Sequence, residues 1–417
     1  MNRKIKLAVV AALALGATSA FATNGTNLVG LGTKSRALGG TGVAVGLGAE
    51  SALANPALIT STKNTEVSFA GTLFMPDVKS SNMGMADQGQ SASDMNVIPE
   101  VAISHKINDN LYIGVGIFGS AGMGVDYRDA APQTAVTGMS SNLMMMKFST
   151  PIAIKTGGLS IGVAPVLQYG QLDIAYDTNQ DGKLEGNGVS QDFNFGYEAG
   201  VAYTTNYGLT VGSIYKSAID MTYNKQLSKA MDAFTASIPG GPFPMADNLE
   251  QPAEIGVGVA YENKHILLTA DYRNVKWSET KGYGDFGWND QDVLAVGAAV
   301  NIKNLTLRAG YNHATSPIVP NENLALAGNA GDVPKMMGGL MNTLNLALFP
   351  ATVETHYTGG FGYKFSEAVS ADVAVTYVPE TTLSADIHNP MNGSVIPDGI
   401  KTTHSQLGVT GAINFNF

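Results

Sequence analysis

The sequence contains no cysteine, which excludes disulfide bonds and thiolate metal sites. Charged residues are also scarce, at 14% of the chain against roughly 25% in ordinary soluble proteins. The formal net charge is −10, which argues against a nucleic-acid partner. A chain with so few charges cannot cover a large water-exposed surface. We therefore infer that something other than water faces much of this protein.

Long hydrophobic runs are missing as well. Residues 1–22 resemble a secretory signal peptide, because Arg3, Lys4 and Lys6 precede a short apolar run that ends in small residues. The most apolar stretch beyond this leader, residues 336–349, is interrupted by glycine and asparagine. It is shorter than the roughly 20 residues that a helical membrane span needs. The sequence therefore does not predict a helical membrane protein.

Histidine-based metal-binding motifs are absent too. The six histidines are scattered, and H-E-x-x-H does not occur. Residues 177–185 begin like a calcium loop, but Gly188 stands at the twelfth position where the bidentate glutamate should be. An acidic, turn-rich loop is the favoured interpretation of that segment, and calcium binding stays open. We expect no enzyme activity, no cofactor and no metal centre.

What the chain does have is a strict alternation of apolar and small or polar residues after residue 63. The block from Glu254 to Tyr261 places Ile255, Val257 and Val259 against Gly256, Gly258 and Ala260. A period of two is typical of a strand with two different faces. A soluble β-sandwich also alternates, so the length and spacing of the segments must distinguish the two folds.

The alternation predicts fourteen strands, most of them at least as long as the 9 to 11 residues that a tilted membrane strand requires. Long connections alternate with tight turns along the chain, as in a barrel with outer loops and periplasmic turns. We therefore predict an all-β transmembrane fold, a 14-stranded antiparallel outer-membrane β-barrel. The expected strands are 64–80, 95–107, 110–123, 142–156, 158–178, 191–205, 207–225, 251–262, 264–280, 291–303, 305–315, 353–366, 368–387 and 401–417.

Several stretches resemble one family, the FadL-type long-chain fatty acid transporters of the Gram-negative outer membrane, which include aromatic-hydrocarbon uptake proteins. The resemblance runs from about residue 27 to the end, and it rests on GLGTKSRALGGTGVAVGLGAESALANPALI, GVGIFGSAGMGVDYRD, PAEIGVGVAY with ADYRNVKWSE, LRAGYNHATSPI, and YTGGFGYKFS with ADVAVTY. It implies a hatch (plug) at residues 23–63 inside a barrel of residues 64–417. Asn55, Pro56 and Ala57 match the Asn-Pro-Ala motif of the family's hatch.

The resemblance also implies uptake of hydrophobic molecules, and two long loops carry apolar residues for their capture. In 227–245 the apolar residues follow helical spacing, and 336–349 is rich in methionine, which adapts to varied ligands. The alternative is that these residues only pack loop against loop. The expected capture residues are Leu227, Met231, Phe234, Ile238, Phe243, Met337, Leu340, Met341 and Leu344.

Glycines are concentrated in the third predicted strand, where they favour a bulge or kink. The resemblance implies that such a kink opens the wall sideways, so that substrate leaves into the membrane. The alternative is that the glycines make room for the hatch. We expect the kink at Phe118, Gly119, Ser120, Ala121 and Gly122.

Charged residues on the polar face of the predicted strands should point into the lumen, because a lysine or arginine that faces lipid at the membrane midplane costs about 2 to 4 kcal/mol. Among them Arg308, Lys364 and Arg273 are the cations, and the first two could bind a carboxylate, although pairing with lumen acids is favoured. Lys34 and Arg36 are expected to join the hatch to the wall. The acids of this set are Glu198, Glu254, Asp271 and Asp372.

The expected partners are a hydrophobic small molecule and outer-membrane lipid, including lipopolysaccharide. The barrel-assembly machinery is a further expected partner, because Phe417 ends an alternating strand and resembles the signal that this machinery recognises. No nucleic acid is expected, and the chain should be monomeric. Long-chain fatty acids are the favoured substrates, and aromatic hydrocarbons or alkanes are the alternative. An outer-membrane lipase or deacylase and a general porin are more distant alternatives.

Overall fold

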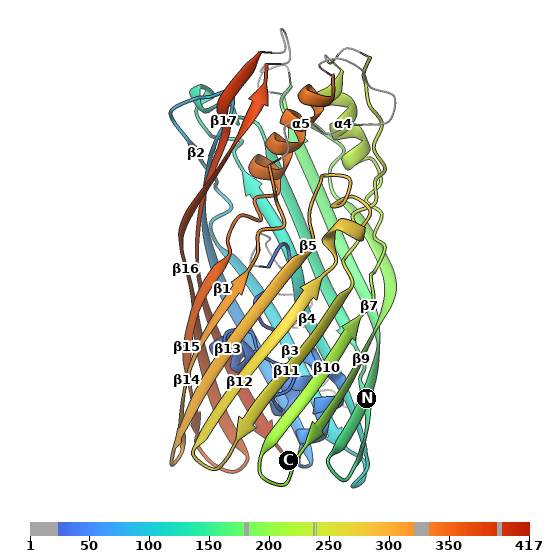
Figure 1. Ribbon diagram of the computed structural model, residues 1–417, viewed down its shortest axis with the longest axis vertical. Helices are drawn as coiled ribbons and strands as arrows, with labels where there is room; N and C mark the ends of the chain where they lie inside the picture. The colour runs from blue at the N-terminus through green and yellow to red at the C-terminus, as the bar shows by residue number, and fades with distance from the viewer. Residues whose placement is uncertain (1–23, 179–182, 237, 239, 321–332, 390–393) are drawn as a thin grey trace.

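The protein is a closed antiparallel barrel (Figure 1). The computed structural model describes residues 24–178, 183–236, 238, 240–320, 333–389 and 394–417. The expected signal peptide lies outside these residues. The long wall strands are β1 (Thr65–Ser81), β3 (Asn96–Lys106), β4 (Leu111–Asp126), β5 (Ser140–Ser149), β6 (Ile152–Thr156), β7 (Leu159–Tyr176), β9 (Ser190–Thr204), β10 (Leu209–Lys216), β11 (Glu254–Glu262), β12 (Ile266–Val275), β13 (Gln291–Ile302), β14 (Leu305–Ala314), β15 (Thr355–Lys364), β16 (Val369–His388) and β17 (Val395–Asn416).

The number of wall crossings is fourteen in the described part of the chain, which confirms the predicted barrel. Strands β5 and β6 both pair with β4 on one side and β7 on the other, so they are two halves of one crossing. The break falls at Thr150 and Pro151, and Pro151 has no N–H to donate. Two further strands of two residues only extend loop ends, namely β2 (Gly89–Gln90) and β8 (Glu185–Gly186).

The barrel closes between its first and last strands. Strand β1 pairs with β17 from Glu66 opposite Asn416 to Ser81 opposite Lys401. Beyond this register, the N–H of Phe417 donates to the carbonyl of Thr65 at 2.9 Å. Closure leaves no long strand edge free at this seam, which protects the sheet from pairing with other chains.

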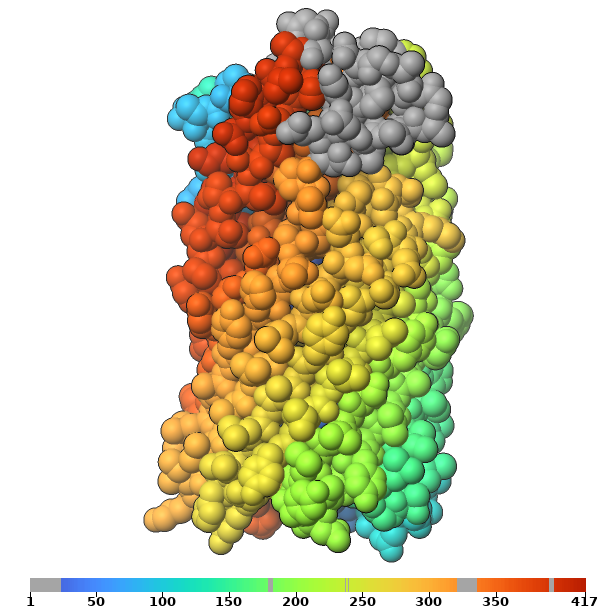
Figure 2. All heavy atoms as spheres, viewed as in Figure 1, coloured from blue at the N-terminus to red at the C-terminus, as the bar shows by residue number. Residues whose placement is uncertain are grey.

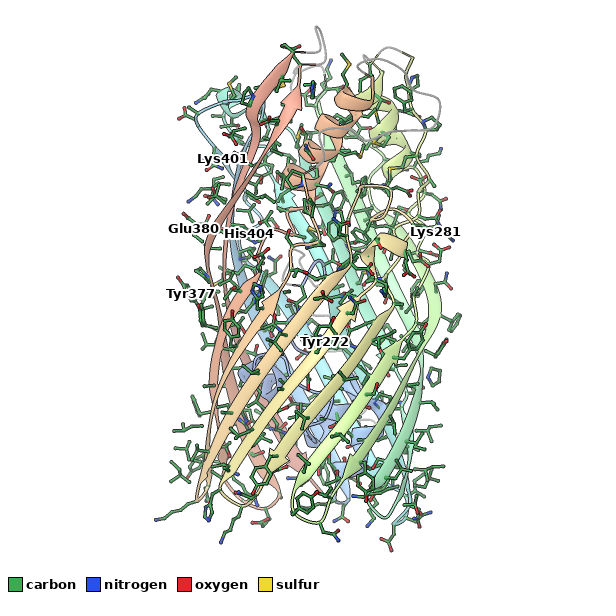
Figure 3. The ribbon with its side chains drawn as sticks, viewed as in Figure 1. Tyr272, Lys281, Tyr377, Glu380, Lys401 and His404 are labelled. Atoms are coloured by element: carbon green, nitrogen blue, oxygen red, sulfur yellow. The ribbon has the colours of Figure 1, made fainter. Side chains whose placement is uncertain are left out.

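Apolar residues cover the outside of the wall, and polar residues face inward. In β11 the side chains of Ile255 and Val257 are 48% and 52% exposed, whereas Glu254 is 4% exposed. Figure 3 shows Tyr272 and Tyr377 part-way up the wall, with Lys281, Glu380 and Lys401 above them. Figure 2 shows the tilted strands as a continuous outer surface on the face viewed. This inside-out distribution is typical of a barrel embedded in a membrane. Among the described residues, no helix combines the length and apolarity needed to cross a membrane.

Some predicted strand ends were wrong. The strand expected at 207–225 ends at Lys216, because the chain then leaves the sheet and enters the lumen. The alternation continues there, but Ile219 bridges to Gln251 and Thr222 to Asn248 instead of to a wall strand. The last strand begins at Val395 rather than at 401, and β12 stops at Val275 rather than at 280.

Residues 24–64, the described part of the chain before β1, lie inside the lower half of the barrel (Figure 1). They form four short helical turns that touch opposite walls. The first of them contacts β14, β15 and β16, and the last contacts β6, β7 and β9. These turns are α2 (Thr33–Ala37), η1 (Gly48–Glu50), α3 (Ser51–Ala54) and η2 (Pro56–Ser61).

The upper half of the barrel is filled by one large apolar cluster of wall and loop residues. Two loop helices, α4 (Leu227–Thr235) and α5 (Val333–Thr343), lie at the upper end (Figure 1). Helix α5 continues into the π-helical turn η5 (Leu344–Leu348). The remaining short turns are η3 (Pro132–Thr134) and η4 (Trp277–Glu279). The barrel thus has a polar lower part occupied by the N-terminal segment and an apolar upper part.

Candidate functional site

An apolar cavity of about 170 Å³ lies at the upper end, between α4 and α5. The structure therefore brings together the two apolar loops that were predicted to capture the substrate. Four predicted capture residues line this cavity, namely Phe234, Ile238, Leu340 and Leu344. The other lining residues are Asn82, Met83, Met139, Met336, Gly339, Thr343, Leu348, Ile387 and His388.

Helix α5 is fixed against the end of β16. A Cβ atom on Gly339 would lie 2.8 Å from the backbone nitrogen of His388, so only glycine lets the helix approach this closely. The side chain of Asn342 donates to the carbonyl of Asp386 at 3.1 Å. On the other side, the rings of Phe234 and Tyr176 lie 5.0 Å apart, which holds α4 on β7. The cavity walls are thus anchored to the barrel.

The remaining predicted capture residues do not line the cavity. Leu227, Met231, Met337 and Met341 are at most 4% exposed and belong to the apolar cluster that fills the upper lumen. Phe243 is partly buried against the same cluster. For these five residues the contacts agree with the alternative interpretation, in which the stripe packs loop against loop.

Three aromatic rings occupy the centre of the upper lumen, and the sequence reasoning missed them. The rings of Trp277, Tyr283 and Trp288 lie 4.6 to 5.1 Å apart, and all three are at most 1% exposed. Burial raises the pKa of the Tyr283 hydroxyl, which therefore stays uncharged. One signal in the sequence could have indicated this aromatic cluster: the chain has two tryptophans, and both stand in this loop.

The wall changes its pairing at the predicted kink. The last residue pair shared by β3 and β4 is Glu100 with Phe118. Beyond it β4 pairs only with β5, and its register shifts between Gly119 and Ala121, as in a β-bulge. The five predicted kink residues therefore lie where β4 loses one neighbour. Gly116 agrees with the alternative interpretation, in which the glycines make room for the hatch. A Cβ there would lie 2.8 Å from the side chain of Leu53 in α3.

The freed edge of β4 is paired with the N-terminal segment, here residues 24–28. Asn27 forms an isolated antiparallel bridge with Ala121. The N–H of Gly122 donates to the carbonyl of Thr26 at 3.1 Å, and the N–H of Leu28 to that of Ser120 at 3.5 Å. This segment thus replaces the hydrogen-bonding partner that β3 no longer supplies.

Apolar side chains fill the space between β3 and β4 at the same height. Leu28 packs with Ile98 of β3 and Phe74 of β1, and all three are buried. A Cβ on Gly119 would lie 2.7 Å from the Ile98 side chain, so Ile98 sits directly across the unpaired edge. Without Leu28 and its segment, this part of the wall would keep Ile98 but would have no backbone hydrogen-bonding partner for β4.

The Asn55-Pro56-Ala57 turn rests on two glycines of the wall. Gly162 of β7 and Gly200 of β9 are a cross-strand pair. A Cβ on Gly200 would lie 1.9 Å from Asn55 Oδ1, and one on Gly162 would lie 2.4 Å from Pro56. Asn55 also caps η2, because its Oδ1 accepts from the N–H of Ala57 at 3.0 Å. The turn therefore lies in direct backbone contact with the wall.

Charged side chains join the N-terminal region to the wall elsewhere. Arg36 donates to both carboxylate oxygens of Glu100, at 2.6 and 2.8 Å. Lys34 lies 3.7 Å from Glu50 within the same region, so its expected contact with the wall is replaced by an internal one. Asp271 of β12 accepts from the N–H groups of Gly42 and Val43 at 2.7 and 2.9 Å.

The three predicted lumen cations differ in their partners. Arg308 donates to Asp372 at 2.7 Å. Lys364 lies at the lower rim, where it is 43% exposed and contacts Glu367. Arg273 lies 3.8 Å from Glu254, and its Nη2 donates to the carbonyl of Val29 at 3.3 Å. Of the three cations in the described part of the chain, Arg273 is the one with a buried side-chain nitrogen, Nε, that has no hydrogen-bond partner.

A polar cavity of about 60 Å³ lies beside Arg273 and behind the unpaired part of β4. Its lining combines the N-terminal segment with five wall strands. Glu254 is shared by Lys216, at 3.1 Å, and Arg273. The lining includes Asn27, Leu28, Ser120, Lys147, Lys216, Gln251, Glu254, Asp271 and Arg273.

No group of three or more His, Cys, Asp or Glu residues that could hold a metal ion occurs among the described residues. The segment considered for calcium, residues 177–185, falls partly outside them. Its described part supplies a contact between Thr178 and Glu185, at 2.9 Å. Calcium binding at this loop stays untested.

Comparison with known proteins gives one family and several relatives. Residues 7–327 match the model of a family described as outer membrane protein transport protein (OMPP1/FadL/TodX). Outer membrane protein P1 of Haemophilus influenzae is 24% identical over 390 residues, covering 78% of this chain and 79% of P1. The crystal structure of the Pseudomonas putida toluene transporter TodX is similar with a TM-score of 0.68 at 17% identity, covering 94% of this chain and 99% of that chain.

A shorter match is found in Chlorobium limicola. There, an uncharacterized protein encoded in the 5′ region of the phosphoenolpyruvate carboxykinase gene is 41% identical over 108 residues. The match covers 25% of this chain and 51% of that protein, so the chain spans about half the length of this relative. The likeness to TodX concerns the fold, given the low identity.

Proposed function

Because the chain belongs to the OMPP1/FadL/TodX family and is an outer-membrane transporter of hydrophobic compounds, we propose that its leading substrates are long-chain fatty acids. The proposed route has three stages: capture between α4 and α5, passage through the apolar upper lumen, and lateral exit beside β4. The family consists of transport proteins, so the lipase or deacylase alternative is set aside.

The apolar upper lumen supports this route on energetic grounds. Moving a hydrocarbon chain into water costs about 0.8 kcal/mol per CH₂, or more than about 10 kcal/mol for sixteen carbons. A hydrophobic substrate therefore needs apolar surface along its whole path. The cluster from the capture cavity down to Trp277 and Trp288 supplies that surface, and the buried tyrosine hydroxyls within it stay uncharged.

The size of the capture cavity bears on the substrate. An apolar cavity of ~150 Å³ holds a benzene molecule, so the 170 Å³ cavity accommodates one aromatic ring or a segment of a longer chain. TodX is described as a toluene transporter. Aromatic-hydrocarbon or alkane uptake by the same route is therefore the second candidate.

The observation that supports lateral exit is the edge of β4 that lacks β3 as a neighbour. A strand in a closed barrel normally has two neighbours, but β4 above Phe118 has the N-terminal segment in place of β3. Displacing residues 24–28 removes both the hydrogen bonds to β4 and the Leu28 side chain. The opening this creates is the proposed exit from the lumen behind β4 to the membrane.

The hatch at residues 23–63 is proposed to close the lower route. Its backbone contacts paired wall glycines and donates to Asp271 of β12, and its Arg36 contacts Glu100 of β3 on a different side of the barrel. A substrate moving toward the periplasm would have to break all of these contacts. Sideways movement requires only the short N-terminal segment to shift.

A carboxylate, where the substrate has one, is proposed to bind at Arg273. Arg308 and Lys364 already contact Asp372 and Glu367. Arg273 has an unpartnered Nε and lines the polar cavity behind the exit. Contact of the apolar wall with outer-membrane lipid and lipopolysaccharide belongs to the same proposal. So do recognition of Phe417 by the barrel-assembly machinery and a monomeric state.

The test is uptake competition among a long-chain fatty acid, an alkane and a monoaromatic compound, in cells that carry the wild type, Phe234→Asp or Leu340→Asp. Either charge in the cavity should strongly reduce uptake of all three, while Phe234→Leu, the matched control, should retain most of it. Unchanged uptake in both Asp variants would refute capture at this cavity. A large steady conductance of the wild type in a planar bilayer would instead favour a general porin.

A further inference from the structure

Three polar side chains among the described residues, those of Asn82, Thr343 and His388, line the otherwise apolar capture cavity. Asn82 and His388 are 8% and 9% exposed. The Oδ1 of Asn82 and the Nδ1 of His388 have no hydrogen-bond partner among the described residues. A buried polar group without a partner destabilises a protein, so two of them in one cavity need an explanation.

Both residues are held in place by their backbones. Asn82 directly follows β1, and its N–H donates to the carbonyl of Thr134 at 2.9 Å. His388 ends β16, where Gly339 of α5 packs on its backbone nitrogen. The two side chains are therefore anchored by the wall and by α5 and do not belong to a freely moving loop.

The third polar lining residue is already engaged. The hydroxyl of Thr343 donates to the carbonyl of Gly339 at 3.1 Å, within α5. No lysine, arginine, aspartate or glutamate is among the described residues that line the cavity. Within that part of the chain, the available polar capacity is an amide and an imidazole.

This arrangement selects the chemistry of a ligand. An ionised carboxylate is costly to bury without a cation, whereas a hydroxyl or a protonated carboxyl group can both donate and accept a hydrogen bond. An amide offers N–H donors and an oxygen acceptor, and an imidazole ring offers nitrogens that hydrogen-bond, so the two side chains can pair with such a group. A bare hydrocarbon would leave both unpaired.

We propose that the capture cavity is selective for hydrophobic molecules that carry one uncharged hydrogen-bonding head group, a hydroxyl or a protonated carboxyl, which Asn82 and His388 bind. The apolar body of the ligand lies along Phe234, Leu340 and Leu344. This inference rests on the proposed capture role of the cavity and adds the substrate class to it. It predicts that phenols and long-chain alcohols compete better than toluene and alkanes of matched size.

The test compares ligands that differ only in the head group, using full-length protein in lipid nanodiscs. Dissociation constants are measured for p-cresol against toluene and for decanol against decane. A hydrogen bond contributes about 0.5 to 1.5 kcal/mol, or roughly two- to tenfold in affinity. Asn82→Leu and His388→Phe should each reduce the preference for the head group by about that factor, while the affinity for toluene and decane stays within about twofold.

Two further arms complete the experiment. Asn82→Ser replaces the amide with a hydroxyl, which can still donate and accept a hydrogen bond, and should retain part of the preference. Heat-dependent gel mobility confirms that each variant is folded. Decanoic acid should bind more tightly as the pH falls toward the ordinary carboxyl range of about 4 to 5. Decanol, measured at the same pH values, reports any change in the protein itself.

The outcomes separate this inference from the proposed function. Suppose that Phe234→Asp loses binding of every ligand, while the ratio of cresol to toluene affinity is unchanged in the Asn82 and His388 variants. This result would support capture at the cavity and overturn head-group selectivity. Equal losses for cresol and toluene in those variants would overturn it as well. A fall in the ratio with toluene binding preserved supports it.

Discussion

Arg36 of α2 donates two hydrogen bonds to the carboxylate of Glu100 in β3, at 2.6 and 2.8 Å, and both side chains are buried. Glu100 is also the uppermost residue of β3 that pairs with β4. The ion pair therefore fixes the hatch to the wall at the lower rim of the unpaired edge. It holds β3 in place, whereas residues 24–28 above it can move away from β4.

Removing one partner of this pair should loosen the hatch. A single Arg36→Met or Glu100→Met change leaves a buried charge unpaired, which typically costs about 3 to 5 kcal/mol. We expect each single variant to raise ion conductance in planar bilayers and to lower the temperature of heat-modified gel mobility. The double variant removes both charges and should recover much of the loss. Equal behaviour of single and double variants would contradict a role for the pair itself.

The glycine seat of the Asn-Pro-Ala turn gives a second prediction. Gly200→Val would place side-chain atoms on Asn55 Oδ1, which lies 1.9 Å from the position of a Cβ. The hatch should be displaced, and sensitivity to large antibiotics should increase several-fold. Gly411→Val is the matched control, because nothing lies within 4 Å of a Cβ at this strand glycine. Similar permeability of the two variants would argue that the turn does not seat the hatch.

A reversible lock on the N-terminal segment tests lateral exit. Asn27 and Ala121 form an antiparallel bridge, and the Cα atoms of such pairs lie about 4.5 to 5.5 Å apart, within disulfide reach. Because the protein lacks cysteine, Asn27→Cys/Ala121→Cys introduces a single bridge. Uptake should fall to background when the bridge is oxidised and return on reduction.

The control for this lock joins two strands that are already paired. Ala70 of β1 lies opposite Ala412 of β17 in the closing seam. Ala70→Cys/Ala412→Cys should leave uptake unchanged in either redox state. If the lock between residues 27 and 121 also leaves uptake unchanged, substrate does not leave beside β4.

The two tryptophans report on the N-terminal segment. A Cβ on Gly25 would lie 2.4 Å from the ring of Trp277, and Gly25 has φ +65°. Gly25→Val should push the segment away from β4, shift tryptophan emission to longer wavelength and raise uptake of large hydrophobic substrates. Gly157→Val is the control, since Gly157 has φ +57° but no neighbour within 4 Å. A shared emission shift in both variants would point to general destabilisation instead.

The barrel was predictable because it depends on local patterns. The alternation around residues 255–261 marks two faces of a strand wherever that strand sits, and long loops alternate with tight turns along the chain. Strand ends were less predictable. Alternation at Ile219 and Met221 continues after β10 has ended, because residues facing a packed lumen alternate just as residues of a wall do.

The site was predictable only in part. Helical spacing indicated the apolar face of 227–245, but it did not separate Phe234, which lines the cavity, from Met231, which is buried beneath it. Asn82 and His388 carry no motif, and they are brought together only by the ends of β1 and β16. Among the glycines of β4, the sequence did not reveal that Gly116 faces the hatch whereas Gly119 faces Ile98.

The sequence by itself determined the class of fold, the number of wall crossings, the apolar outer face and the resemblance to a transporter family. These follow from period, composition and short motifs, which act between neighbours along the chain. The tertiary structure alone decided which apolar residues surround a cavity and which polar atoms remain without partners. It also decided which strand edge is paired with residues 24–28. Such features arise where segments far apart in the sequence pack together, and no local pattern encodes that contact.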